Sequence, residues 1–348
     1  MNKFLVGCFA VETKNARLNG SCKDVEKSNS TLENIAYTKK IISKNGIHPY
    51  MSAQKIKYTI KNNSGLKISN VKQVNTKEAV SEGNPYINFD EDVMGFMIAQ
   101  TLELSKEEYD DLSDIEKKFF TKSGKKYKKN ITKKRRSRFM LSPLQAINHT
   151  KIQTEFCTKM TDKQNLIYSK EVYSTVMSAG FCLDVENVGK FNISEDSSGF
   201  RDYESKEVDI LKVEVKNNAF ELPKEEKEKR IIAVLKGIQY LWTHSCQNNN
   251  YEDIGTKFVI LADYKIGHGI FNNIFRNGNL DINYLVEAIK ENEDFRISDI
   301  YIGIRSGFMD DVKKELEDEI NRHSELKDCV VIGTVKEVFD NYIENMKI

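Results

Sequence analysis

Residues 3–11 limit the possible folds more than any other segment, because nearly every position in them is apolar. A strand with one face in water alternates apolar and polar residues, whereas a continuous apolar run indicates a strand covered on both faces. A second run of this kind, at 256–262, predicts another buried strand. We therefore expect a sheet whose central strands are shielded on both sides.

Patterns typical of helices and patterns typical of strands are interspersed along the chain. Ser52 is a good N-cap and Gly65 a good stop for a helix between them, and Ile56 and Ile60 would share its buried face. Further strands are expected at 139–152, 166–185, 297–304 and 329–335, and further helices at 223–244, 281–292, 308–323 and 336–346. This order predicts an α+β fold, an RRM-like or ferredoxin-like palm that spans 1–348 as a single domain and carries large insertions.

A strongly basic segment lies within one of these insertions. Although the whole chain has a net charge of +1, the stretch from Lys122 to Arg138 contains many cations and no acid. Local positive charge beside ordered structure favours contact with a polyanion. Two other interpretations remain open: a solvated surface loop, or neutralisation by the acidic stretch from Glu103 to Glu116.

The helix after Ser52 offers a second place for an anion. Ser52 and Gln54 lie at its first turn, where free amide protons and the helix dipole attract negative charge. Lys57 and Lys61 are four residues apart and share one face. The alternative is an ordinary amphipathic helix with its lysines in solvent.

Composition argues against several functional classes. No apolar stretch is long enough to span a membrane, and the six cysteines are scattered, as is typical of reduced thiols in a cytoplasmic protein. The five histidines are isolated, so no metal site is predicted. No Walker loop, GxGxxG or GxSxG is present, and no cofactor is expected.

Three stretches, the second of them in two parts, together resemble the type I-B CRISPR-associated Cas-seven family, DevR type. Pro49–Tyr58 is similar to the family's Y-x-S-x-Q-x-x-x-Y at the start of its first helix. Asp92–Met97 is similar to D-x-F-G-Y-M, although Met94 and Phe96 replace Phe and Tyr, and Arg135–Leu144 is similar to R-R-x-S-x-x-x-V-S-P-L. Lys170–Asp184 is similar to E-F-Y-x-T-x-x-x-G-x-F-x-L-D.

This resemblance implies a backbone subunit of Cascade, an antiviral surveillance complex. Its partners would be crRNA, target DNA, further copies of itself and other Cascade subunits. Residues 66–135 would form the fingers and 188–220 a thumb hairpin with exposed aromatic tips, Phe191 or Phe200, which could equally be core residues. The predicted RNA-binding residues are Arg17, Asn19, Ser52, Gln54, Lys57, Lys61, Arg135, Arg136, Arg138 and Phe200.

A catalytic function is the main alternative. Relatives in type III systems cut RNA with an acid near the loop after the first strand, and this loop contains Asp24, Glu26 and Glu33. Acids in loops are usually solvated, so the resemblance favours a binding protein that is not an enzyme. A metal-dependent endoribonuclease and a generic single-stranded RNA-binding module remain the alternatives.

Overall fold

The chain forms two compact units. The first unit comprises Met1–Ser64, Leu141–Asp184 and Val234–Lys347, and the second unit comprises Gly65–Met140 and Val185–Ala233. Both expected insertions, 66–135 and 188–220, fall in the second unit, where they share one compact body. The computed structural model describes residues 2–21, 35–73, 79–98, 101–130, 133–196, 198–244 and 250–346.

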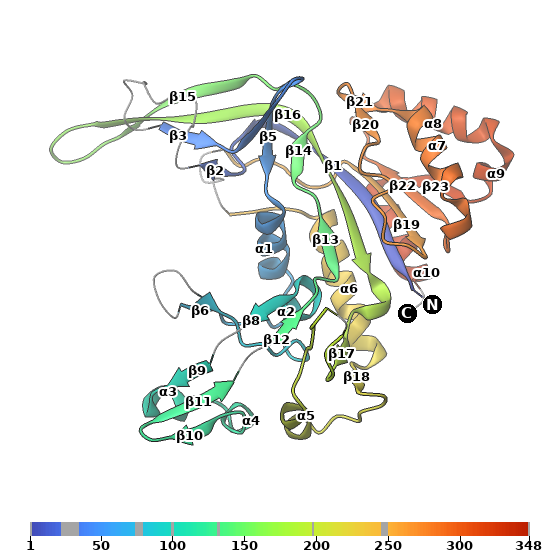
Figure 1. Ribbon diagram of the computed structural model, residues 1–348. Coiled ribbons are helices and arrows are strands. Elements are labelled where there is room, and N and C mark those ends of the chain that lie inside the picture. The colour runs from blue at the N-terminus through green and yellow to red at the C-terminus, as the bar shows by residue number, and fades with distance from the viewer. Residues whose placement is uncertain are drawn as a thin grey trace. The chain divides into compact units, whose positions relative to one another are not determined.

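A large sheet forms the centre of the first unit (Figure 1). Its strands follow the order β23 (Val330–Gly333), β22 (Ile300–Ile304), β19 (Phe258–Tyr264), β1 (Phe4–Ala16), β16 (Leu166–Asp184), β14 (Leu144–Ala146), β5 (Gly46–Met51) and β4 (Lys40–Ser43). Strand β1 runs antiparallel to both neighbours, with Cys8 opposite Gly180 on one side and Ile260 on the other.

Both faces of the central strands are covered, as the apolar runs predict. On one face, Val6 and Cys8 of β1 share a buried cluster with Leu285 of α7 (Ile282–Glu291) and Leu316 of α8 (Asp310–Arg322). On the opposite face, Tyr342 of α10 (Val335–Asn345) donates a hydrogen bond of 2.7 Å to Asp263 of β19. The prediction of a strand shielded on both sides is confirmed.

Two helices complete the palm. Helix α1 (Ala53–Asn63) follows β5, begins at the Ser52 cap as predicted, and ends before Gly65, whose φ is +70°. Helix α6 (Lys224–Gln239) begins in the second unit and ends in the first, before β19. The central order β19-β1-β16-β14, with these two helices between strands, confirms the predicted α+β class and is consistent with an RRM-like palm.

A long hairpin extends from this sheet (Figure 1). Strand β15 (Ile152–Lys159) pairs with the first half of β16, from Ile152 opposite Tyr173 to Lys159 opposite Leu166. The other elements that the first unit contains, wholly or in part, are β2 (Gly20–Ser21), β3 (Ile35–Thr38), β13 (Phe139–Leu141), β20 (Phe275–Arg276), β21 (Asn279–Leu280), η2 (Glu293–Phe295) and α9 (Ser324–Lys327).

The second unit has its own small core. Phe191, Tyr203 and Phe220 pack together there, with ring centroids 5.2 to 5.8 Å apart. Its elements are β6 (Lys72–Gln73), β7 (Ala79–Val80), α2 (Phe89–Met94), β8 (Phe96–Ile98), β9 (Thr101–Leu104), α3 (Lys106–Asp110), α4 (Asp114–Lys117), β10 (Thr121–Ser123), β11 (Lys126–Asn130), β12 (Lys133–Arg135), η1 (Val185–Asn187), β17 (Lys190–Asn192), α5 (Ser205–Leu211) and β18 (Ala219–Glu221).

The two aromatic residues considered for the tips of a thumb hairpin at 188–220 differ in burial, since Phe191 is buried and Phe200 is half-buried. Strand β17 does pair with β18, but Phe191 lies opposite Phe220 and is fully buried. Phe191 packs inward with Tyr203 and Phe220, which is the core alternative for this residue, whereas Phe200 is not part of this small core. Within the described residues, no helix has the length and apolar composition that crossing a membrane would need.

Candidate nucleic-acid interface

The start of α1 gathers several of the predicted RNA-binding residues. The Ser52 hydroxyl accepts a hydrogen bond from the Lys55 amide at 3.4 Å and another from Asn19 Nδ2 at 3.3 Å. The Asn19 carbonyl in turn accepts a bond of 3.2 Å from the Thr38 hydroxyl. Asn19 is only 8% exposed, so its side chain links the end of β1 to the helix cap. In this structure its side chain positions Ser52, and RNA contact by Asn19 itself stays a prediction.

Arg17 lies close by in sequence, at the end of the long strand β1. Its side chain is half-buried, and within the described part of the chain its Nε–H is buried without a hydrogen-bond acceptor. A buried donor without an acceptor is costly, and an anion or a water molecule at this position would satisfy it. Arg17 thus remains a candidate for phosphate contact.

The burial of side chains along α1 agrees with the sequence prediction for the isoleucines but not for the lysines. Ile56 and Ile60 are buried, which confirms the predicted inner face. Lys57 and Lys61 are half-buried, and burial lowers the pKa of the Lys57 ammonium. The exposed side chains are Gln54, Tyr58, Asn62 and Asn63. Gln54, Tyr58 and Asn62 follow one another at intervals of four residues, a sequence signal that predicts a shared face of the helix.

The second unit contains a buried cluster of charges around Asp92. Arg135 forms ion pairs with Asp92 and with Asp202, the latter at 2.8 Å, and all three side chains are buried. Arg230 pairs with the second Asp92 oxygen at 2.6 Å. Although burial alone would lower the pKa of Arg135, the two aspartates raise it. Arg135 is therefore a structural residue, and its prediction as an RNA contact is corrected.

Alternation along β12 explains this correction. Successive side chains of a strand point to opposite faces, and here Lys133 and Arg135 are buried while Lys134 and Arg136 lie on the outer side. The Arg136 side chain is 51% exposed and forms an ion pair of 3.1 Å with Asp196. Arg138 is half-buried, and its amide donates to the Val93 carbonyl at 2.8 Å.

Phe200 lies between two of these cations. The Arg136 guanidinium carbon is 4.6 Å from the centroid of its ring, and the Lys134 ammonium is 4.7 Å from it. Phe200 is half-buried, so part of its ring can still meet solvent. Arg136, Lys134 and Phe200 thus form a cationic, aromatic surface, which suits contact with nucleic acid.

The lysine-rich stretch 122–129 forms a β-hairpin. Lys126 and Lys128 each pair with Glu103 of β9, at 2.8 and 2.5 Å, and their hydrogen bonds lower the pKa of Glu103 to about 2. Neutralisation by the acidic stretch, one of the interpretations left open by the sequence, is confirmed for these two lysines. Lys122 and Lys125 remain exposed on the hairpin.

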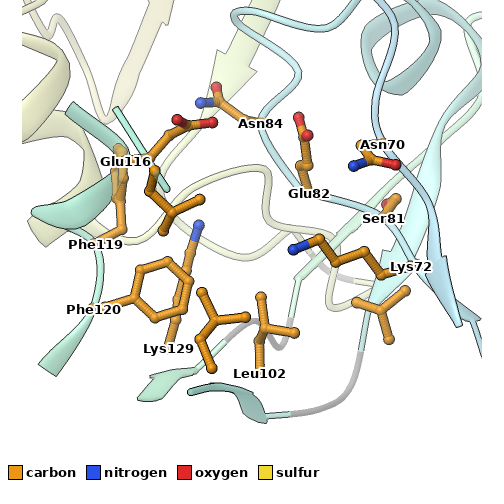
Figure 2. A pocket seen from close by; sticks show the side chains of 13 residues that line it. Asn70, Lys72, Ser81, Glu82, Asn84, Leu102, Glu116, Phe119, Phe120 and Lys129 are labelled. Carbon is orange, nitrogen blue, oxygen red and sulfur yellow. The ribbon is translucent and has the colours of Figure 1, made fainter. Parts of the chain in front are cut away.

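The second unit also has a small, partly open pocket of about 90 Å³ (Figure 2). Leu102, Leu104 and Phe120 contribute to its apolar wall, and Lys72, Glu82 and Glu116 to its polar rim. Within the described residues, no group of three or more His, Cys, Asp or Glu side chains could hold a metal ion. Asp24, Glu26 and Glu33, the acids considered for catalysis, lie outside the described residues.

The hairpin of β15 and β16 carries a surface that the sequence did not suggest. Phe156, Met160, Leu166 and Ile167 are exposed on it, with Phe156 at 65% and Met160 at 82%. In the register of the two strands, Phe156 and Ile167 share one face of the hairpin and Leu166 lies on the other, so both faces expose apolar side chains, which suits contact with a partner. The polar residues between them masked this pattern in the sequence.

Comparison with known proteins places the chain among CRISPR-associated proteins. A family model described as "CRISPR-associated negative auto-regulator DevR/Csa2" matches residues 34–252. A solved chain of a "CRISPR RNA-guided surveillance complex" is similar with a TM-score of 0.52 and 8% identity, over 98% of each chain. A chain from "CRISPR RNA-guided surveillance complex, pre-nicking" has a TM-score of 0.49 and 8% identity, over 86% of this chain and 92% of that one.

No curated protein sequence gives a significant match. At such low identity, the first of these likenesses shows the fold alone. The family match is more informative, because it covers more than half of the chain and includes α1, β12 and both segments of the second unit.

Proposed function

We propose that this chain, which belongs to the CRISPR-associated negative auto-regulator DevR/Csa2 family, is a crRNA-binding backbone subunit of a type I Cascade surveillance complex. The observation that carries the proposal is the start of α1. There a capped helix N-terminus presents Ser52 and Gln54 on a rigid element, with Lys57 and Lys61 one and two turns further along.

The chemistry of this site suits a guide of any sequence. Backbone phosphates are bound by ammonium groups, hydroxyls and helix N-termini, and such contacts do not depend on the bases. A surveillance complex needs this property, because its guide carries a different spacer for each target. The same argument supports Arg136 and Arg17 as further phosphate contacts.

Several copies are proposed to line one crRNA and present it for pairing with target DNA. Support comes from the hairpin of β15 and β16, whose apolar side chains would be covered by a neighbouring copy or by another Cascade subunit. We propose that this hairpin, and not 188–220, takes the role of the thumb. The type I-B subtype stays a prediction from sequence.

A binding role without catalysis is part of the proposal. Incubation of the assembled complex with RNA matched to the guide and with Mg²⁺ should leave that RNA intact. Specific cleavage that Asp24→Ala abolishes would instead favour the metal-dependent endoribonuclease. A cytoplasmic location is also proposed, in keeping with the reduced thiols of Cys8 and Cys182, whose pKa values burial raises.

The decisive experiment is to identify the RNA that purifies with the chain. The protein is expressed in a host that carries a CRISPR array, and the bound RNA is extracted and sequenced. Fragments of uniform length that share one repeat-derived end are expected. Heterogeneous cellular RNA would overturn the Cascade assignment and leave a generic single-stranded RNA-binding module.

A further inference from the structure

The exposed stripe of α1 forms one wall of a groove in the first unit. Gln54, Tyr58 and Asn62 line it from the helix, and Thr243 and His244 line it from the segment that follows α6. The groove has a volume of about 700 Å³. Asn63 Nδ2 donates a hydrogen bond of 3.1 Å to the Trp242 carbonyl, which ties this segment to the helix.

A second groove adjoins the first. It has a volume of about 540 Å³, and Trp242 and Tyr251 line it together with Thr243 and His244, which both grooves share. The rings of Trp242 and His244 meet edge to face, with centroids 4.3 Å apart and planes at 71°. The two grooves therefore form one continuous surface. Tyr58 lines the first groove, and Trp242 and Tyr251 line the second.

The aromatic side chains of this surface are unusually open to solvent. Tyr58 is 64% exposed, Trp242 is 46% exposed and Tyr251 is 93% exposed. Large rings are normally buried because they supply so much apolar area. Three of them in adjoining grooves indicate a surface that another molecule covers.

The polar groups of the grooves favour a nucleobase as that molecule. Among the described residues that line the first groove, none carries a carboxylate, while Gln54, Asn62 and Asn63 carry amides. Asn62 and Asn63 each donate one N–H to a carbonyl, that of Tyr58 at 2.8 Å and that of Trp242 at 3.1 Å, and each amide has a second N–H and an oxygen that can bond a base edge. The acids of the second groove are engaged within the fold. Glu252 accepts from the amides of Lys14 and Asn15 at 2.9 and 2.8 Å, and Asp253 pairs with Arg305 at 3.2 Å.

We propose that these grooves hold unstacked bases of single-stranded RNA, with Tyr58 and Trp242 as the stacking faces and the α1 amides at the base edges. Stacking on aromatic rings tolerates any base, which is what a guide of variable sequence requires. The inference rests on the proposed RNA-binding function and adds base contacts to the phosphate contacts of the same helix.

Trp242 makes the test direct, because it is the single tryptophan of the chain. The full chain, freed of RNA at high salt, is titrated with an oligouridylate of about twelve nucleotides that carries a label at one end. Anisotropy of the label measures binding, and tryptophan fluorescence reports on the groove. Quenching that follows the binding curve is expected, whereas an abasic ribose-phosphate oligomer of equal length should bind without quenching.

Two variants measure the contribution of the rings. Trp242→Ala and Tyr58→Ala should each weaken binding by about 5- to 150-fold, the range measured for loss of one base–aromatic stack, without changing the salt dependence. Phe295→Ala, which removes a partly exposed ring that lines neither groove, is the matched control and should bind normally. Circular dichroism confirms that each variant is folded.

The outcomes separate this inference from the function on which it rests. Normal oligonucleotide binding without quenching, together with normal affinity of both groove variants, would overturn the inference and leave RNA binding intact. If Trp242→Ala binds RNA normally but no longer assembles with other copies, the groove is a protein contact and the inference fails. Absence of all oligonucleotide binding would count against RNA binding itself, and therefore against both.

Discussion

Arg135 and Arg136 are neighbours with opposite environments, and substitution should separate their roles. Arg135→Ala leaves Asp202 buried without its guanidinium partner and weakens the Asp92 cluster, so we expect a loss of about 3–5 kcal/mol in the free energy of unfolding. Arg136→Ala removes an exposed ion pair and should change that free energy by less than about 1 kcal/mol. Urea unfolding of the RNA-free variants measures both; equal losses would contradict this assignment.

Lys57 and Lys61 should act on RNA binding through charge. Each lysine that neutralises a phosphate of a single strand adds about 0.7 to the slope of log affinity against log salt, so Lys57→Ala with Lys61→Ala should reduce the slope by about 1.4. Lys122→Ala with Lys125→Ala removes the same charge from exposed positions of the finger hairpin and is the matched control. A slope that the helix variant leaves unchanged would exclude α1 as a phosphate clamp.

Lys57 should also give RNA binding a characteristic pH dependence. Burial lowers the pKa of its ammonium, so this lysine loses its proton at a lower pH than an exposed lysine does. Only the charged form attracts phosphate, and RNA affinity should therefore fall as the pH rises through this lowered pKa. Lys57→Arg keeps its charge at alkaline pH and should flatten the profile in a binding titration. An identical fall in both proteins would assign the pH dependence to another group.

At the scale of elements, the contact between α1 and α6 depends on the absence of a side chain at Gly237. A Cβ at this position would lie 2.7 Å from Ile60 Cγ2 and 3.0 Å from Ile60 Cγ1. Gly237→Ala gains up to about 1 kcal/mol of helix propensity, but the overlap costs about 1–3 kcal/mol. We therefore expect a net loss of stability, measured by chemical denaturation.

The effect of Gly237→Ala on the free energy of unfolding should change sign when Ile60 is replaced by a shorter residue. Ile60→Ala removes the two atoms nearest to the new Cβ and leaves only the Cβ of residue 60, at 3.2 Å, which a shift of a few tenths of an ångström relieves. In that background Gly237→Ala should therefore stabilise the protein by up to about 1 kcal/mol. The double-mutant cycle thus measures how strongly this contact couples α1 to α6. Equal effects of Gly237→Ala in both backgrounds would show that the two residues do not interact.

Elements whose pattern lies within a short segment were predictable from the sequence. The burial of side chains that contact residues far away in the sequence was not. The covered strand β1 and the capped helix α1 follow from patterns within about ten residues, and the structure confirms both. The burial of Arg135 depends on Asp92 and Asp202, which lie far from it in sequence. Phe191 was equally compatible with an exposed tip or a core, and contact with Phe220 decides for the core.

At the scale of the whole molecule, both compact units are assembled from separate stretches of chain. The first unit is interrupted twice, and the two interruptions together make the second unit. The insertions expected at 66–135 and 188–220 lie within these two interruptions, but the ion pairs that join the interruptions to each other, such as Lys133 with Glu207 at 2.8 Å, connect residues far apart in sequence. Long-range pairing of this kind is what a single sequence does not reveal.

The proposed assembly of several copies on one RNA makes a last prediction, which concerns the hairpin of β15 and β16. Phe156→Asp with Met160→Asp places charge where exposed apolar side chains would meet a partner, yet it should leave the fold stable because both positions face solvent. We expect this variant to bind RNA but to form short complexes in mass photometry, where the unmodified chain forms long ones. Ile115→Asp, an exposed apolar position in the second unit, is the control and should assemble normally. Long complexes of the hairpin variant would mean that copies meet through another surface, because a charge buried at an interface without a partner opposes association.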